Sequence, residues 1–268
     1  MTAGVVGLVA AAMIAAFRAP LGAQADVVTI QLPPRPGQTI HVQTTQSYDT
    51  VTTPPVPGRD PIVNHGELTS AYAETVGPRS NDREYTVRLT FEEAPGLLRS
   101  LVGTPVDAVF DERGRLQRVA LPAPLADASD QMRPLVAAFV AENWLQGWPP
   151  SVTLSVGASA SVPSAIQLPM PGAGNGVGIS GGRTLKLVSI GRDGSDRIAT
   201  LEQTVEASMS GPMTGGASPS IDVSGTGTIE WNVDRGYARR IDLEVTVDGS
   251  GPDGRTRGTE RVHVTAAN

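Results

Sequence analysis

Residues 228–247 read TIEWNVDRGYARRIDLEVTV. Apolar and polar residues alternate in the first and last parts of this stretch, as they do when one face of a β-strand is buried and the other faces water. Arg235-Gly236 lies between the two parts, and its glycine supplies the positive φ that a short hairpin turn requires. The stretch therefore predicts two antiparallel strands joined by a turn. Its alternating apolar residues are Ile229, Trp231, Val233, Leu243, Val245 and Val247.

The same alternation recurs on both sides of this hairpin. Tyr85, Val87, Leu89 and Phe91 alternate with polar residues, and Val262 and Val264 flank His263. This pattern is typical of an antiparallel sheet that buries one face. Further turns are predicted between the strands, at Asp193-Gly194, Asp248-Gly249 and Asp253-Gly254. Three segments rich in Gly, Pro and Ser are predicted to be loops: Pro54–Gly66, Pro169–Gly182 and Ser208–Ser220.

A helical pattern interrupts the strands at residues 126–148. Its apolar residues fall at helical spacing and form one stripe, and Pro149-Pro150 ends the pattern. We expect one amphipathic helix packed on the sheet. The stripe consists of Met132, Leu135, Val136, Phe139, Val140, Asn143 and Trp144.

The helix divides the chain into an N-terminal β half (26–125) and a C-terminal β half (149–268). Arg113–Leu121 and Arg235–Leu243 both read R-G-x-x-x-R-[V/I]-x-L. An internal structural repeat would explain this match, and so would two unrelated alternating hairpins. The expected fold is mainly β, as an antiparallel curved sheet, a pair of sheets or a half-barrel, with one central helix.

Residues 1–25 have the features of a signal peptide. Residues 4–17 carry no charge and are too few to span a bilayer, which needs about 20 apolar residues. Ala23-Gln24-Ala25 has the small-x-small form that signal peptidase accepts, so cleavage is expected after Ala25. We therefore expect an exported protein, periplasmic or extracellular, without a membrane span in its mature part.

Charge and composition exclude some function classes. Loss of residues 1–25 would remove one charged side chain, Arg18, and change the net charge from −6 to −7. Phosphate binding needs clustered positive charge, so we expect no nucleic-acid partner. The chain has no cysteine, which excludes both disulfides and a lipid-modified N-terminal cysteine.

Two short glycine motifs overlap at residues 176–182. Gly178-Ile179-Ser180-Gly181-Gly182 satisfies G-x-S-x-G, but a nucleophile elbow also needs a following helix and a suitable later histidine. Gly176–Gly181 satisfies G-x-G-x-x-G without the strand–turn–helix context of a dinucleotide site. We therefore expect Ser180 to lie in a flexible loop, and we expect neither catalysis nor a bound cofactor.

The three histidines, His41, His65 and His263, lack the spacing of zinc ligands. His41 and His263 would approach each other only if the terminal strands pair, and two ligands would still be missing. No metal site is therefore expected.

Aromatic residues gather around the end of the predicted helix. Phe139, Trp144 and Trp148 lie there, and they either complete a core or line an apolar groove between helix and sheet. Apolar pockets between packed elements are typical ligand sites. These three residues are the candidate ligand-binding residues for a lipid or another hydrophobic molecule.

The layout resembles that of a known family. Pro36-Gly37-Gln38-Thr39-Ile40 leads into long strands, a hairpin follows at Asp111–Gly114, and Val156-Gly157-Ala158-Ser159 opens the second half. This resembles a family of secreted bacterial β-rich proteins defined by a domain of unknown function. More distantly, it is similar to the envelope half-barrels that carry lipids or lipoproteins. A tryptophan-type position usual after the Val-Gly element is Ala158 or Ala160 here, and no functional residue can be transferred.

The sequence thus predicts an exported, non-enzymatic β protein that binds a hydrophobic ligand or a partner protein of the envelope. The alternatives are a secreted hydrolase that uses Ser180 or clustered carboxylates, and a structural or assembly module that uses an exposed edge strand.

Overall fold

The computed structural model describes residues 27–31, 36–80, 84–111, 116–121, 151–168, 177–210, 220–251 and 254–268. Nearly all of them lie in β-strands, so the chain is mainly β, as the alternation predicts. The strands of the N-terminal half are β1 (Val27–Gln31), β2 (Thr39–Thr53), β3 (Ile62–Ser80), β4 (Glu84–Glu93), β5 (Pro105–Asp111) and β6 (Leu116–Ala120), with a 3-10 helix, η1 (Gly96–Leu101), between β4 and β5. Those of the C-terminal half are β7 (Ser151–Ser155), β8 (Ser159–Leu168), β9 (Val177–Asp193), β10 (Asp196–Ser210), β11 (Ser220–Asn232), β12 (Tyr237–Gly251) and β13 (Gly254–Ala267).

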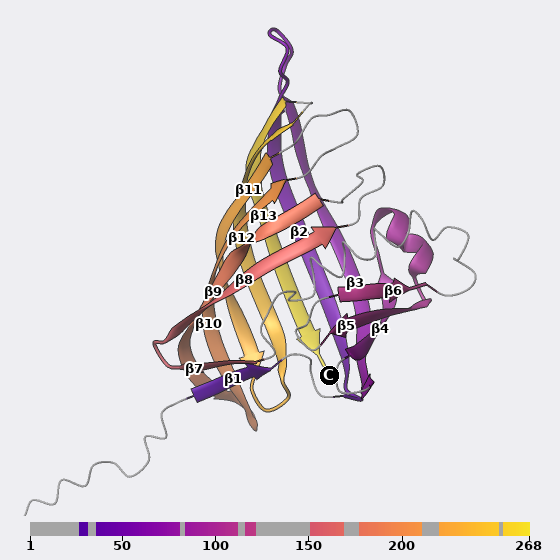
Figure 1. Ribbon diagram of the computed structural model, residues 1–268, viewed down its shortest axis with the longest axis vertical. Helices are drawn as coiled ribbons and strands as arrows, with labels where there is room; N and C mark the ends of the chain where they lie inside the picture. The colour runs from indigo at the N-terminus through magenta and orange to yellow at the C-terminus, as the bar shows by residue number, and fades with distance from the viewer. Residues whose placement is uncertain are drawn as a thin grey trace, which may run out of the picture.

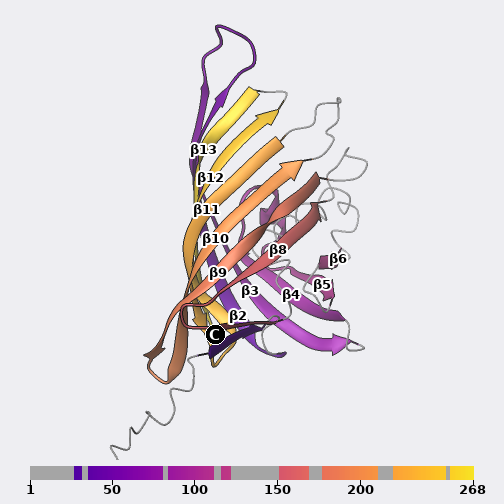
Figure 2. The same ribbon diagram turned by 60° about the vertical axis from the view of Figure 1, so that its left-hand side comes forward.

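Eleven strands form one antiparallel sheet in the order β6-β5-β4-β3-β2-β13-β12-β11-β10-β9-β8. Neighbouring strands follow one another in the chain except at the centre, where β2 pairs with β13 from Thr53–Arg255 to His41–Ala267. The two predicted halves therefore join in a single sheet. Its edges, β6 and β8, do not pair with each other, so the described strands form no closed barrel. Figures 1 and 2 show the sheet curling so that one face is concave and the other convex.

The hairpin predicted from residues 228–247 is confirmed. β11 and β12 pair in register, with Ile229 opposite Ile241 and a β-bulge next to Trp231. Gly236 makes the turn with φ 79°, a conformation that costs glycine little because it has no Cβ. The turn predicted at Asp193-Gly194 is confirmed as well, since it joins β9 to β10.

The turn predicted at Asp248-Gly249 is wrong. Both residues lie inside β12, paired with Asp222 and Ile221 of β11. A Cβ at Gly249 would lie 2.9 Å from Cγ1 of Ile221. Close packing of the strands thus explains the glycine at this position. The turn was predicted because glycine is common in turns.

The three predicted loops extend too far into the strands. Residues 62–66 begin β3, residues 177–182 begin β9, and Ser208 and Ser220 belong to β10 and β11. Each segment gains backbone hydrogen bonds from a neighbouring strand, which offsets its low content of apolar side chains. Residues 169–176 and 211–219 lie outside the described part of the chain.

A small second sheet closes one end of the concave face. β1 and β7 pair antiparallel with each other and with no strand of the main sheet. Their apolar side chains pack on the concave face of β8–β11, so β1 of the N-terminal half contributes to a core of the C-terminal half. This core contains Val28, Ile30, Val152, Leu154, Val162, Leu185, Leu187, Ala199, Leu201, Ile229 and Trp231.

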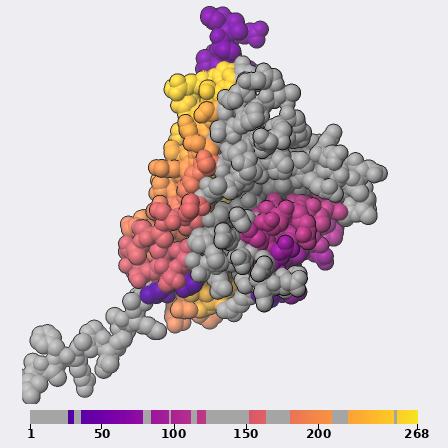
Figure 3. All heavy atoms as spheres, viewed as in Figure 1, coloured from indigo at the N-terminus to yellow at the C-terminus, as the bar shows by residue number. Residues whose placement is uncertain are grey.

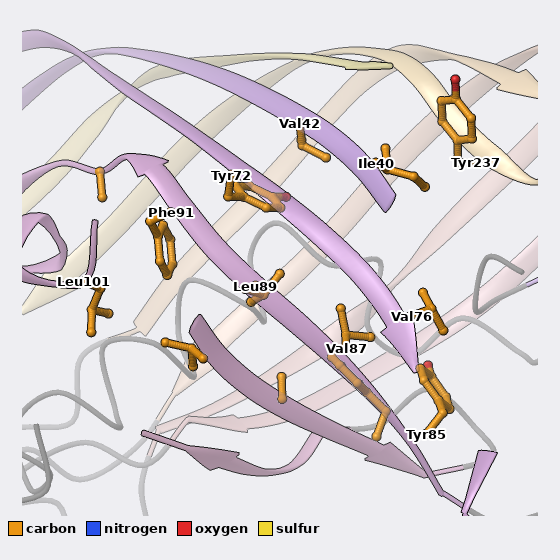
Figure 4. Close-up of a cluster of buried hydrophobic side chains, with 14 residues drawn as sticks. Ile40, Val42, Tyr72, Val76, Tyr85, Val87, Leu89, Phe91, Leu101 and Tyr237 are labelled. Carbon is orange, nitrogen blue, oxygen red and sulfur yellow. The ribbon is translucent and has the colours of Figure 1, made fainter. Parts of the chain in front are cut away.

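A second core lies on the concave face of β2–β5 and is closed by η1 (Figure 4). Tyr85 stacks on Phe110 with ring centroids 5.4 Å apart, and Tyr72 packs at a tilt against Phe91. Leu101 of η1 and Tyr237 of β12 complete the cluster. Both cores lie toward the end of the sheet away from the β2–β3 hairpin tip.

The structure gives no support to the predicted central amphipathic helix. Within the described ranges, η1 is the only helical element and no α-helix is present. The predicted helix, residues 126–148, lies outside those ranges. Among the described residues, no helix is long and apolar enough to cross a membrane.

Candidate functional site

The residues predicted to line a groove are not part of the described structure. Phe139, Trp144 and Trp148 all fall within residues 122–150. The third tryptophan, Trp231, is fully buried in the core beneath β1 and β7. The candidate site is therefore built from the strands themselves.

Ser180 does not lie in a nucleophile elbow. It lies within β9, paired with Ala165 of β8 and Ser208 of β10, and it is exposed on the convex face. An elbow needs a strained turn between a strand and a helix, and β9 continues from here as a strand to Asp193. The expectation of a flexible loop at Ser180 is therefore wrong as well.

The structure does not bring His41 and His263 together. β2 and β13 do pair, but His41 lies opposite Ala267 and His263 opposite Thr45. The two residues are thus about four positions apart along the ladder, roughly 14 Å at 3.4 Å per residue. Their Nδ1 atoms contact carboxylates instead, Glu92 at 2.8 Å and Asp242 at 2.6 Å. Among the described residues, no group of three or more metal-ligating side chains comes together.

The convex face carries ion pairs between neighbouring strands. Lys186 of β9 donates to Glu202 of β10 at 3.1 Å, and Arg261 of β13 donates to Glu244 of β12 at 2.7 Å. The side chains of these four residues are about half exposed or more. Exposed pairs of this kind contribute about 0–1 kcal/mol each, so they add little to the stability of the sheet and mark the convex face as solvated.

The concave face changes character along the strands. Beyond the two cores, toward the β2–β3 hairpin, apolar side chains continue but are interrupted by polar ones, and most of them are only partly buried. One cross-strand row contains Leu68, Val262 and Leu243, with Gln46 of β2 between Leu68 and Val262, and Leu68 is 41% exposed. The next row contains Val205 and the buried Val245 on either side of Gly225, with Glu260 of β13 opposite Val245. Glu260 accepts a hydrogen bond from Gln46 at 3.3 Å. We call this region, beyond the cores and on β2, β3 and β9–β13, the upper concave face.

A buried amide lies at the boundary between the core and the upper concave face. Gln203 of β10 is 2% exposed, and neither its Nε2 nor its Oε1 has a hydrogen-bond partner. It lies between Leu185 of β9 and Gly227 of β11. A buried polar group without a partner costs about 1–3 kcal/mol. The core alone gives no reason for an amide here.

A basic side chain lies diagonally across the strand pair from Gln203. Arg183 of β9 pairs with Val205, and Gln203 pairs with Leu185, so the two polar residues are diagonal neighbours on one face. Diagonal Cβ atoms lie about 7–8 Å apart, within reach of long side chains. Desolvation lowers the pKa of Arg183 to about 10, which still leaves the guanidinium positively charged at neutral pH.

Glycines line the same part of the concave face. Gly227 lies opposite Gln203, and Gly225 lies opposite Val205. A Cβ at Gly227 would lie 2.1 Å from the backbone oxygen of Asp242, and one at Gly225 would lie 2.3 Å from that of Glu244. The strand geometry therefore requires glycine at both positions, and the backbone beside Gln203 carries no side chains.

A second buried polar residue belongs to the core of β2–β5. Glu74 of β3 is 7% exposed and lies between Ile40 of β2 and Leu89 of β4. Desolvation by burial raises its pKa to about 8. Burial and, to a lesser degree, the charge of Glu74 raise the pKa of Tyr72 well above its ordinary value. At neutral pH most Glu74 carboxyls are therefore protonated.

Sequence reasoning missed Gln203, Arg183 and Glu74, although a signal was present. Each residue occupies the apolar phase of an alternating strand: Gln203 between Leu201 and Val205, and Glu74 between Tyr72 and Val76. A polar residue in that phase faces the concave side of the sheet when the strand forms, so the alternation places it on the face that carries the cores.

No protein-family model matches the chain, and a search of the curated proteins finds no match either.

Proposed function

We propose that the chain is an exported, non-enzymatic protein that binds a hydrophobic ligand on the concave face of a half-barrel sheet. The observation that carries this proposal is the upper concave face. There apolar side chains continue beyond the core, interrupted by Gln46 and Glu260. Leu68, Leu243 and Val262 are only partly buried. The opposite face of the same strands carries ion pairs.

Partly exposed apolar rows lose the stabilisation that full burial would give, about 25 cal/mol per Å². Contiguous apolar surface on a folded protein marks an interaction site more often than scattered exposed residues do. An acyl or isoprenoid chain lying along the strands would cover these rows, and its binding needs no catalytic group. The signal features of residues 1–25 favour a carrier that works in the periplasm or outside the cell.

Native mass spectrometry of the protein purified from its own host tests this function. Retained ligand mass, or uptake from a lipid panel after delipidation, is the expected result. Leu243→Asn on the concave face should reduce uptake, and Glu244→Asn, its neighbour on the convex face, should not. Circular dichroism checks that both variants are folded. A clean apo mass together with no uptake from any lipid would refute the proposal.

The free edge of β3 supports partner-protein binding as a second function. β4 pairs with β3 only from Ala71 onward, so none of the described strands pairs with Ile62–Ser70 on the side away from β2. Ile62 and Val63 are 56% and 61% exposed, and Figure 3 shows the tip of the β2–β3 hairpin projecting beyond the other strands. An unpaired edge accepts an added strand through its backbone groups.

A photo-crosslinking residue at Glu67 on this edge, introduced in the native host, tests the second function. A discrete protein adduct that disappears in Val63→Lys is expected, because a charge on an edge strand opposes strand addition. The same crosslinker at Thr246, on the convex face of a central strand, is the control. No adduct at position 67, or an equal one at position 246, would exclude the edge as the interface.

A further inference from the structure

The upper concave face combines three features beside one another. Gln203 presents a fully buried amide whose donor and acceptor atoms are both without partners. Arg183 brings a positive charge to the diagonal position on the next strand. Gly225 and Gly227 leave the adjoining backbone without side chains. Both glycines are explained by the close approach of the β12 backbone, and they leave the backbone beside Gln203 uncovered by side chains.

The apolar rows alone would accept any hydrophobic chain, but these polar groups favour a particular head group. The Gln203 Nε2 and the guanidinium are both hydrogen-bond donors. A carboxylate or phosphate oxygen accepts from both, and hydrogen bonds to a charged group are stronger than neutral ones. A neutral head group, such as an alcohol, would gain less from Arg183.

We propose that the Gln203–Arg183 pair is the head-group site of the concave face and that it binds the acidic head of an amphiphile whose tail lies on the apolar rows toward the hairpin. This inference rests on the proposed function and adds the substrate class. Since the amide atoms are shielded from water, the head group reaches them by displacing the atoms around them. Binding then gives the amide Nε2 the acceptor that it otherwise lacks.

Three probes with the same sixteen-carbon tail test the head group: palmitate, hexadecyl phosphate and hexadecanol. Each is titrated into the delipidated full-length mature protein by displacement of a fluorescent fatty-acid analogue. Tighter binding of an acidic probe than of hexadecanol is expected. The two acidic probes distinguish a carboxylate head from a phosphate head, and either preference supports the site.

Variants on strands β9 and β10 separate the site from general charge effects. Arg183→Met and Gln203→Leu should each weaken binding of the preferred acidic probe by about tenfold or more, while hexadecanol binding changes less than threefold. Lys186→Met removes a positive charge from the convex face of the same strand and should leave all three affinities unchanged. If Arg183→Met fails to fold, Arg183→Lys, which keeps the charge, should retain the preference for acidic probes.

The outcomes distinguish this inference from the function on which it rests. Equal binding of acidic and neutral probes, or acidic binding that survives both Arg183→Met and Gln203→Leu, overturns the head-group site while leaving a hydrophobic carrier intact. A loss of affinity in Lys186→Met as large as in Arg183→Met also overturns it. Failure of all three probes to bind the unaltered protein overturns the proposed function itself.

Discussion

Replacing Glu74 by glutamine should remove a large part of the pH dependence of stability. The Glu74 carboxyl is buried between Ile40 and Leu89, and burial raises its pKa from 4.5 to about 8. Between these values the unfolded chain releases the proton and the folded chain keeps it. The folded state therefore binds more protons in this range, and the free energy of unfolding falls as pH rises from about 4.5 to 8.

The two pKa values differ by about 3.5, and at about 1.36 kcal/mol per pKa unit the full loss is about 5 kcal/mol. Relaxation around a buried charge makes this an upper bound, so we expect a loss of about 2–5 kcal/mol between pH 5 and pH 9. That is a large fraction of the 5–15 kcal/mol typical of a folded domain. Glu74→Gln carries no titrating proton and should not show this loss.

Urea unfolding at pH 5, 7 and 9, followed by far-ultraviolet circular dichroism, measures the difference. Near pH 5 the two proteins should have similar stability, and at pH 9 the variant should be the more stable. Tyr72 does not contribute in this range, since its pKa is raised further above its ordinary value. Glu244→Gln, on the exposed convex face, is the matched control and should follow the unaltered protein. Parallel loss of stability in the unaltered protein and Glu74→Gln would refute the reasoning.

Three further predictions concern glycine, the buried amide and export. Gly181→Ala should destabilise the protein by about 2 kcal/mol or more, because its Cβ would lie 2.1 Å from a backbone oxygen of β10; Gly182→Ala, with its nearest contact at 3.6 Å, should change stability little. Equal melting temperatures of the two variants would contradict this. Gln203→Leu should raise the free energy of unfolding of the ligand-free protein by about 1 kcal/mol by removing an unpaired amide; a loss in urea unfolding would show that the amide is satisfied. Edman sequencing of secreted material should begin at Asp26, and an intact Met1 would contradict cleavage after Ala25.

The strands were predictable because alternation is a local property. In residues 85–91 and 228–247, apolar and polar residues alternate, and this assigns successive side chains to opposite faces of a strand. The structure confirms strands there. The joining of the two halves into one sheet was not predictable, because β2 and β13 lie at opposite ends of the chain. Pairing across such a distance leaves no local pattern.

Glycine was the main source of error. Gly181 and Gly249 indicated a loop and a turn, yet both lie within strands where a side chain would collide with a neighbouring strand. A glycine that permits a turn and a glycine that permits close packing look the same in a single sequence. The site residues were missed for a different reason. Gln203 and Glu74 are polar, and a search for alternating apolar residues does not detect polar residues at the same alternating positions of a strand.

The pairing of β2 with β13 also has a kinetic consequence. Every other neighbouring pair in the main sheet is formed by strands that follow one another in the chain and can close as soon as both exist. The central pair needs residues 39–53 and 254–267, so it forms after nearly the whole chain has been made and has the largest loop-closure cost. Until then β2 carries an unpaired edge in the middle of the future sheet. We expect this step to limit the folding rate. A chaperone that covers the edge of β2 during that interval would protect the chain from aggregation through its unpaired strand edge.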